Sequence, residues 1–158
     1  MQIEVRQKTT LKETPLPAKT LLIVEGHDVL RASLRDFLKT FFPGCRLLEA
    51  KNGEESLAIA SRENPEVILM DMGLPGINGI EITRRIKTRV PQARVVVIGT
   101  HDSHEYRAHT SESGAIAYLV KDKIGMELIP LITKLLSHPA DRDGKSLGNE
   151  EFGDSGIW

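Results

Sequence analysis

The sequence has little of what several classes of protein need. It contains a single cysteine, Cys45, so no disulfide can form within the chain. No stretch approaches the roughly 18 apolar residues of a transmembrane helix, and residues 1–18 lack the apolar run of a signal peptide. The 21 basic and 22 acidic side chains nearly cancel to a net charge of -1, which leaves no electrostatic footprint for nucleic acid or an anionic membrane. These absences predict a cytoplasmic protein with no direct nucleic-acid or membrane contact.

The composition indicates one folded domain between two polar ends. Hydrophobic residues make up 40% of the chain and charged residues 27%, which suits a single domain with a substantial core. Residues 1–19 mix charge, threonine and proline, which predicts a flexible arm. Residues 138–158 lose periodicity and fill with glycine and charge, which predicts a disordered tail. The folded domain is therefore expected at residues 20–137.

Short apolar runs alternate with longer stretches of helical period. The expected strands lie at 21–24, 46–49, 67–70, 95–98 and 116–120, and the expected helices at 28–42, 53–62, 80–90, 103–113 and 125–136. The first helix carries an apolar stripe of Leu30, Leu34, Leu38 and Phe41, and Pro130 is expected to kink or shorten the last helix. Because parallel strands need crossover helices, the alternation predicts a doubly wound α/β domain with a five-stranded parallel sheet and helices on both faces.

Charged residues fall at the carboxyl ends of the expected strands, where doubly wound sheets gather functional groups. Glu25 follows the first strand, Asp71 the third and Lys121 the fifth. A carboxylate at the tip of an apolar strand is costly unless water, a partner or a metal reaches it. Each residue alone could be a solvated loop charge, but together they favour a joint site for a divalent cation and an anion. Oxygen ligands suit Mg²⁺, and Gly73 leaves its backbone carbonyl accessible as a further ligand.

Three segments carry a resemblance to a known family. Glu25 after LLIV, Asp71 in MDMGLPGING, and Tyr118 with Lys121 in GAIAYLVKD resemble the receiver domain of bacterial two-component response regulators over residues 20–137. The resemblance implies a flavodoxin-like fold of the CheY-like type. It also implies that Asp71 accepts a phosphoryl group from a sensor histidine kinase or phosphotransfer protein. The metal ligands for Mg²⁺ would be Glu25, Asp71 and the Gly73 carbonyl, and Lys121 would contact the phosphoryl group.

The sequence departs from the family pattern at two positions. Gly26 stands where the family has a second acid, which predicts weakly bound Mg²⁺, and nearby Asp28 is expected to cap the first helix rather than bind metal. Gly99 stands where the family has a Ser or Thr that closes on the phosphoryl group. Thr100 is one residue late and should point away, because strand side chains alternate between faces. The coupling of position 99 to Tyr118 is therefore expected to be altered.

The preferred interpretation is a receiver that accepts phosphate on Asp71 in a signalling phosphorelay and is not a metabolic enzyme. The alternative is a pseudo-receiver, a binding module that keeps the fold and partner surface without phosphate control. A phosphatase with an aspartate nucleophile would need a second acid where Gly73 stands. The AYLVKD segment resembles receivers that carry a helix-turn-helix domain, and the sequence ends without one. A downstream partner is expected from about Ser103 to Leu136, where a polar helix allows at most a weak homodimer.

Overall fold

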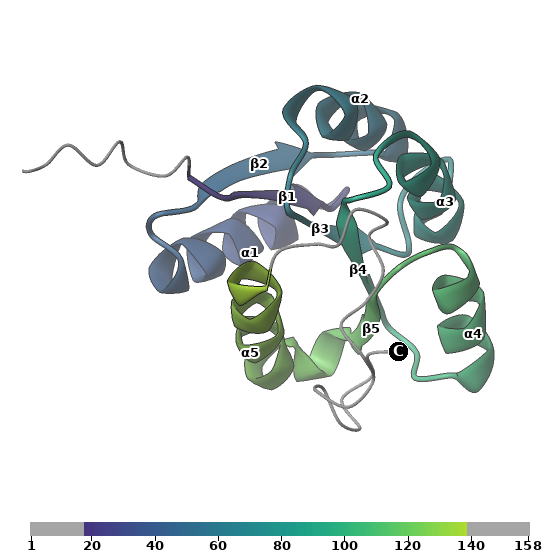
Figure 1. Cartoon of the computed structure of the whole chain (residues 1–158). Coiled ribbons are helices and arrows are strands. Elements are labelled where there is room, and N and C mark those ends of the chain that lie inside the picture. Colours follow the sequence, from purple (N-terminus) through teal and green to yellow (C-terminus); the bar gives the residue numbers. More distant parts are fainter. Residues whose placement is uncertain (1–17, 139–158) are drawn as a thin grey trace, which may run out of the picture.

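The computed structural model of the protein describes residues 18–138 and contains one parallel sheet with helices on both sides (Figure 1). The strands are β1 (Thr20–Val24), β2 (Arg46–Ala50), β3 (Val67–Asp71), β4 (Arg94–Gly99) and β5 (Ala117–Val120). The helices are α1 (Asp28–Phe41), α2 (Gly53–Glu63), α3 (Gly79–Arg89), α4 (His104–Glu112) and α5 (Ile124–Ser137), with a 3₁₀ turn at Lys121–Lys123 before α5. The predicted arm and tail fall almost wholly outside the described residues.

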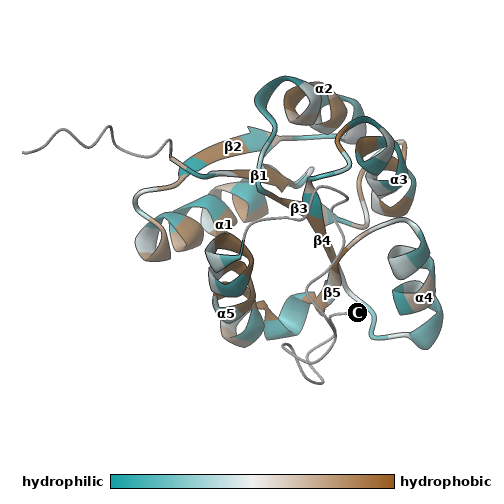
Figure 2. Ribbon diagram, viewed as in Figure 1, coloured by the Kyte–Doolittle hydropathy of each residue, from teal (hydrophilic) through white to brown (hydrophobic). Residues whose placement is uncertain are grey.

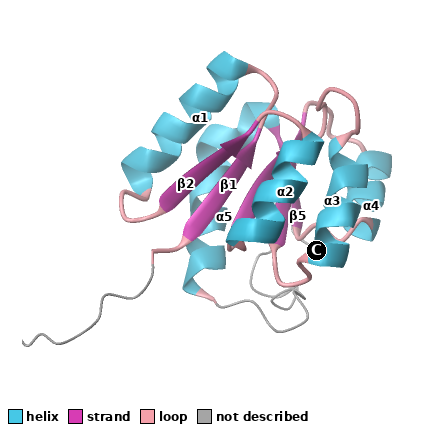
Figure 3. Ribbon diagram, turned by 90° about the horizontal axis from the view of Figure 1, so that it is seen from above, coloured by secondary structure: helices cyan, strands magenta, loops and turns pink. Residues whose placement is uncertain are grey.

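The strand order is β2-β1-β3-β4-β5, and every neighbouring pair is parallel. This confirms the predicted doubly wound sheet. The order reverses between β1 and β3, so the crevice at their carboxyl ends is the position where such sheets bind ligands. Figure 3 views the sheet from above, between its two helical layers.

The core has two halves, one on each face of the sheet. Leu22, Ile68 and Val95 pack on the side of α2 and α3, whereas Leu21 and Leu69 pack with α1 and α5 on the other side. Every residue of β1, β3 and β4 is buried, and Figure 2 shows these strands as an apolar band between more polar helices. Burial on both faces explains why the sequence shows continuous apolar runs instead of alternation.

Helix α1 differs from its prediction in three ways. Leu38 is buried, but Leu30 and Phe41 are 48% and 52% exposed, and Arg31 is buried instead. The expected Asp28 cap is also wrong. His27 occupies the cap position without a side-chain hydrogen bond, and Asp28 is the first helical residue. Two members of the stripe, Leu34 and Leu38, do pack in the core. Arg31 is buried as well because it finds acidic partners that offset the cost of burying its charge.

Pro130 neither ends nor shortens α5, which contains it within a run of 14 residues. Of the two predicted effects of Pro130, shortening of the helix is therefore wrong, and a kink stays a prediction. Pro130 lacks the N–H that would bond to the carbonyl four residues earlier, at Met126. Both residues lie on the exposed side of the helix, where water can donate to that carbonyl. The opposite side of α5 holds it to the sheet through Leu128, Leu131, Ile132 and Leu135.

Candidate functional site

Three charged side chains meet at the carboxyl edge of the sheet. Glu25 follows β1, Asp71 is the last residue of β3, and Lys121 follows β5. The Lys121 Nζ atom lies 3.2 Å from Asp71 Oδ1 and 3.9 Å from Glu25 Oε2. Glu25 and Asp71 are only 8% and 7% exposed. The structure thus brings together the three side chains that the sequence places at strand ends, and the lysine offsets part of their charge.

The position of Asp71 depends on a close approach between β3 and the start of α3. A Cβ atom added to Gly79 would lie 2.4 Å from the Asp71 carbonyl oxygen and 2.8 Å from the Met72 Cα atom. The Gly79 N–H donates a hydrogen bond to the Met72 carbonyl at 3.0 Å. Only glycine allows this contact, because both atoms that a side chain would strike belong to the backbone. Gly79 therefore helps to fix where the acid-bearing strand ends.

Burial governs the electrostatics of Glu25. Loss of solvent raises the pKa of the Glu25 carboxyl, and the neighbouring Asp71 carboxylate raises it further. The His27 backbone N–H, which donates to Glu25 Oε1 at 3.1 Å, and the Lys121 ammonium partly oppose this shift in pKa. At neutral pH the two crowded acids therefore favour any added positive charge at this edge.

This crowding predicts a pH-dependent gain from Glu25→Gln. A raised pKa means that Glu25 favours folding below its unfolded-state pKa and loses that contribution as pH rises through the folded-state pKa. In EDTA at pH 7.5 the variant should therefore be more stable than the wild type, by about 1 kcal/mol in the free energy of unfolding or roughly 2–4 °C in Tm. The gain should shrink toward pH 4.5 in thermal-unfolding measurements. Glu54→Gln, at an exposed position on α2, is the control, and an equal gain at both pH values would contradict this account.

The oxygen atoms at this edge suit a hard cation that keeps most of its water. Candidate ligands are the two carboxylates and the Gly73 backbone carbonyl. A Cβ added to Gly73 would lie 3.9 Å from Asp71 Oδ2, so the Gly73 backbone lies near the Asp71 carboxylate. Within residues 18–138 no three His, Cys, Asp or Glu side chains gather as a metal site. This donor set fits Mg²⁺, which accepts few protein ligands, but it supplies only two carboxylates.

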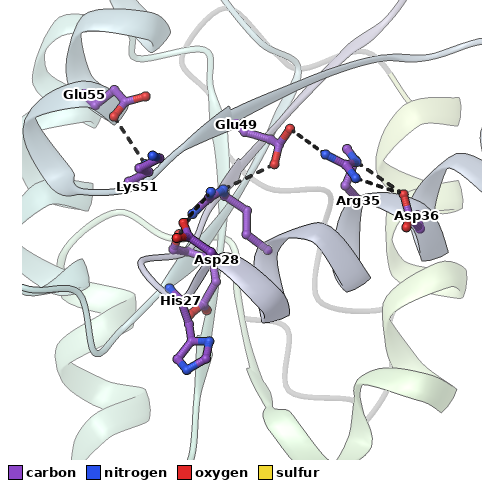
Figure 4. A network of polar contacts seen from close by, with 9 residues as sticks. His27, Asp28, Arg35, Asp36, Glu49, Lys51 and Glu55 are labelled. Carbon is purple, nitrogen blue, oxygen red and sulfur yellow. Dashed lines mark hydrogen bonds and ion pairs between the residues drawn. The ribbon is translucent and has the colours of Figure 1, made fainter.

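Asp28 does not supply the missing carboxylate, because an arginine binds it. Arg31 donates to Asp28 Oδ1 at 2.7 Å, to Glu49 Oε1 at 3.2 Å and to the Glu25 carbonyl at 3.0 Å. Glu49 also pairs with Arg35, and Figure 4 shows Asp28, Glu49 and Arg35 in this network. The Arg31 hydrogen bond lowers the pKa of the Asp28 carboxyl. Arg31 was not predicted as a site residue, although its spacing of three residues from Asp28 on a helix is a recognisable signal.

Gly26 lies against the loop that follows β3. An added Cβ would lie 3.0 Å from Pro75 Cδ and 3.3 Å from the Lys51 carbonyl oxygen. The absence of a side chain at residue 26 therefore matches close packing of two loops at the mouth of the site. An acid at this position would need the Pro75 ring to move by a few tenths of an ångström.

The three residues predicted to form the switch lie on or next to the last two strands. Gly99 ends β4, Thr100 follows it, and Tyr118 lies in β5. Tyr118 is buried, and its hydroxyl donates to the His101 carbonyl at 2.6 Å. Gly99 faces this hydroxyl, because a Cβ added there would lie 2.1 Å from Tyr118 Oη. Thr100 is exposed and lines a hollow of about 320 Å³ with Tyr106 and Gly73, so this hollow adjoins a proposed metal ligand, while Asp71 itself lines a different cleft.

An apolar cleft of about 430 Å³ extends from the charged cluster between α1 and α5. Its walls include Leu30, Leu34, Phe37, Leu69, Ile98 and Ile124, and Glu25, Asp71 and Lys121 line it as well. Leu30 is half-exposed, and the neighbouring Val29 on α1 and Met126 on α5 are exposed. The charged cluster therefore lies beside apolar surface that is open to solvent.

Comparisons with known proteins agree with this geometry. The family model described as response regulator receiver domain matches residues 21–133. The transcriptional regulatory protein DegU of Brevibacillus brevis is 30% identical over 112 residues, which are 71% of this chain and 48% of that protein. The transcriptional activator protein ExaE of Pseudomonas putida is 32% identical over 117 residues, which are 74% of this chain and 55% of that protein. The chain thus spans about half the length of these relatives.

A solved structure gives the same result for the fold. The response regulator protein TrrA from Thermotoga maritima, in complex with Mg(2+)-BeF, superposes with a TM-score of 0.66 and 28% identity, covering 74% of this chain and 98% of that one. No helix among residues 18–138 is long and apolar enough to cross a lipid bilayer. The family match over residues 21–133, the strand order and the charged cluster lead to one conclusion. The chain belongs to the family of response regulator receiver domains.

Proposed function

We propose that the protein accepts a phosphoryl group on Asp71 from a phosphohistidine of a sensor histidine kinase or phosphotransfer protein. The observation that carries this proposal is the Asp71 carboxylate at the open edge of the sheet, 3.2 Å from Lys121 Nζ and beside Glu25. In the transfer, a carboxylate oxygen of Asp71 forms a bond to phosphorus while the bond from phosphorus to the histidine nitrogen breaks. The lysine ammonium offsets the charge that the phosphoryl oxygens bring into the cluster.

Magnesium would be held by the carboxylates of Glu25 and Asp71 and by the Gly73 carbonyl. When bound, it supplies charge neutralisation to the phosphoryl oxygens. The raised pKa of Glu25 supports this assignment, because crowded carboxylates favour an added cation. Since Gly26 contributes no carboxylate, we propose weaker Mg²⁺ binding than a site with three acids would give.

Apolar surface around the cluster supports protein partners. The exposed side chains of Val29, Leu30 and Met126 lie on α1 and α5, the helices that border the cleft containing Asp71. Exposed apolar patches commonly mark protein interaction sites, and this patch suits the phosphate donor. For a downstream partner we propose the surface from about Ser103 to Leu136. Helix α4 is mainly polar, with Tyr106 as its exposed large hydrophobic side chain, which favours a weak homodimer over a stable one.

A pseudo-receiver is the second candidate, and two glycines favour it. Gly26 removes a carboxylate from the metal site, and Gly99 removes the hydroxyl of the switch. Such a protein would keep the fold and the partner surfaces without depending on phosphate. The two functions differ in whether Asp71 takes up phosphate at all.

Phosphoryl uptake from a small donor separates these two functions. The full chain is incubated with phosphoramidate and Mg²⁺, and its intact mass is measured. A receiver should gain the mass of a single phosphoryl group, which base removes, and EDTA should suppress the gain. An unchanged mass at saturating donor and Mg²⁺ would favour the pseudo-receiver.

A further inference from the structure

The ring of Tyr118 occupies space that a side chain at residue 99 would need. Tyr118 of β5 pairs with Val97 of β4, and Val97 lies two residues before Gly99 on that strand. A Cβ added to Gly99 would lie 2.1 Å from Tyr118 Oη, 2.8 Å from Cζ and 3.0 Å from Cε2. The ring is rigid and its side chain is 1% exposed, so it cannot yield by a small bend. A side chain at residue 99 would therefore force the Tyr118 ring or the end of β4 to shift from its present position.

Two contacts hold the ring in this position. The Tyr118 hydroxyl donates to the His101 carbonyl at 2.6 Å. The Arg107 guanidinium lies over the ring, 5.2 Å from its centroid, in a cation–π contact. Arg107 also donates to Asp102 Oδ1 at 2.8 Å and to the Tyr118 carbonyl at 3.4 Å. Tyr118 is thus tied to the β4–α4 loop and, through Arg107, to α4, which belongs to the proposed partner surface.

We propose that Gly99 holds Tyr118 inward in both phosphorylation states, so that the residue at 99 and not the state of Asp71 sets this face of the protein. The inference rests on the proposed function, whose site it describes further. A ligand can shift a conformational equilibrium only through contacts that differ between the two states. Glycine offers no side chain that could move between the phosphoryl group and the ring. A partner that reads α4 and β5 therefore meets one surface, whether or not Asp71 carries phosphate.

Fluorine NMR of the chain labelled with 3-fluorotyrosine tests this inference. The sequence has two tyrosines, Tyr106 and Tyr118, and Tyr106→Phe assigns the two resonances. The Tyr118 resonance should stay at one position in the metal-free protein, with Mg²⁺, and with Mg²⁺ and beryllofluoride. Bound beryllofluoride gives its own fluorine signal in the same spectrum, which reports whether the Asp71 site is filled.

Adding a side chain at residue 99 should release the ring. Gly99→Ala supplies the Cβ without a hydroxyl, and its Tyr118 resonance should move toward the position found for the unfolded chain. Gly99→Ser should move it as well and should add a response to beryllofluoride that the alanine variant lacks. Gly125→Ala is the matched control, because a Cβ there meets nothing within 4 Å, and it should leave the Tyr118 resonance in place.

Two results would overturn the inference. One is a Tyr118 resonance that moves in the wild type when beryllofluoride binds, and the other is a Tyr118 resonance that stays in place in Gly99→Ala. If beryllofluoride does not bind, the proposed function fails, whereas the Gly99→Ala spectrum still decides the inference. If Gly99→Ala does not fold, adding Tyr118→Leu should restore folding by removing the ring end that the new Cβ strikes. Failure of Tyr118→Leu to restore folding would also count against the inference.

Discussion

Asp71→Asn is expected to abolish phosphoryl uptake completely. The amide has no negative charge and is a poor nucleophile, so it cannot form the bond to phosphorus. No other acid replaces it in the charged cluster, because Glu25 is the one further carboxylate within 4 Å of Lys121 Nζ among residues 18–138. Its Oε1 atom accepts the His27 N–H. Uptake is measured by intact mass with phosphoramidate and Mg²⁺, and the base-labile addition should be absent from the variant.

Two acid-to-amide controls make this result specific. Asp28→Asn removes an acid that Arg31 binds next to Glu25, and Asp122→Asn removes an exposed acid beside Lys121. Both should retain uptake, because neither side chain belongs to the cluster. Circular dichroism should show that Asp71→Asn is folded, since asparagine has nearly the same shape. Phosphate addition to the Asn variant would show that another residue is the acceptor.

The central strands could be predicted from sequence because burial on both faces leaves a local signal. The runs at 21–24, 67–70 and 95–98 each agree with β1, β3 and β4 to within one residue at either end. Parallel strands place their carboxyl ends at one edge, so the meeting of Glu25, Asp71 and Lys121 also followed from their order along the chain. A run of apolar residues needs no distant partner to be recognised.

The mistaken predictions concern residues whose environment depends on distant segments. Arg31 can be buried because it forms an ion pair with Glu49 on strand β2. Leu30 is half-exposed because it lies at the edge of the cleft between α1 and α5. Helical periodicity places residues on a face but does not say which neighbour covers that face. Spacing alone therefore predicted that Leu30 faces the core, whereas the buried residue is its neighbour Arg31.

The two unusual glycines were visible in the sequence only as missing side chains. Their physical meaning lies in what occupies the vacated space. At residue 99 it is the ring of Tyr118, and at residue 26 it is the ring of Pro75. The first contact joins residues 19 positions apart in the chain, and the second joins residues 49 positions apart. Such compensation between distant residues cannot be inferred from one sequence without its fold.

Gly26→Asp is expected to strengthen Mg²⁺ binding by about tenfold, or ~1.4 kcal/mol. Affinity in oxygen sites of this kind rises with ligand charge, and the variant adds a third carboxylate beside Glu25 and Asp71. The same charge should destabilise the metal-free protein, because Lys121 is the one basic side chain within 4 Å of the Glu25 and Asp71 carboxylates among residues 18–138. Calorimetric titration with Mg²⁺ measures the first effect, and thermal unfolding in EDTA measures the second.

The contact with Pro75 adds a steric cost that must be separated from the effect of charge. The new Cβ would lie 3.0 Å from Pro75 Cδ, and the proline ring cannot move aside as a flexible side chain would. Overpacking of this kind costs about 1–3 kcal/mol. Gly26→Ala carries the steric cost alone, and Gly26→Asn adds the shape of aspartate without its charge. The difference between the Asp and Asn variants is therefore the contribution of the carboxylate.

A carboxylate at residue 26 should therefore act in opposite directions with and without metal. Relative to Gly26→Asn, the Asp variant should unfold earlier in EDTA and should regain stability as Mg²⁺ is added, because a ligand that binds only the folded state stabilises it. Both effects require the side chain at residue 26 to face Glu25 and Asp71. If the Asp and Asn variants have equal Mg²⁺ affinity and equal stability in EDTA, residue 26 does not converge with the two acids, and the proposed metal site is misplaced.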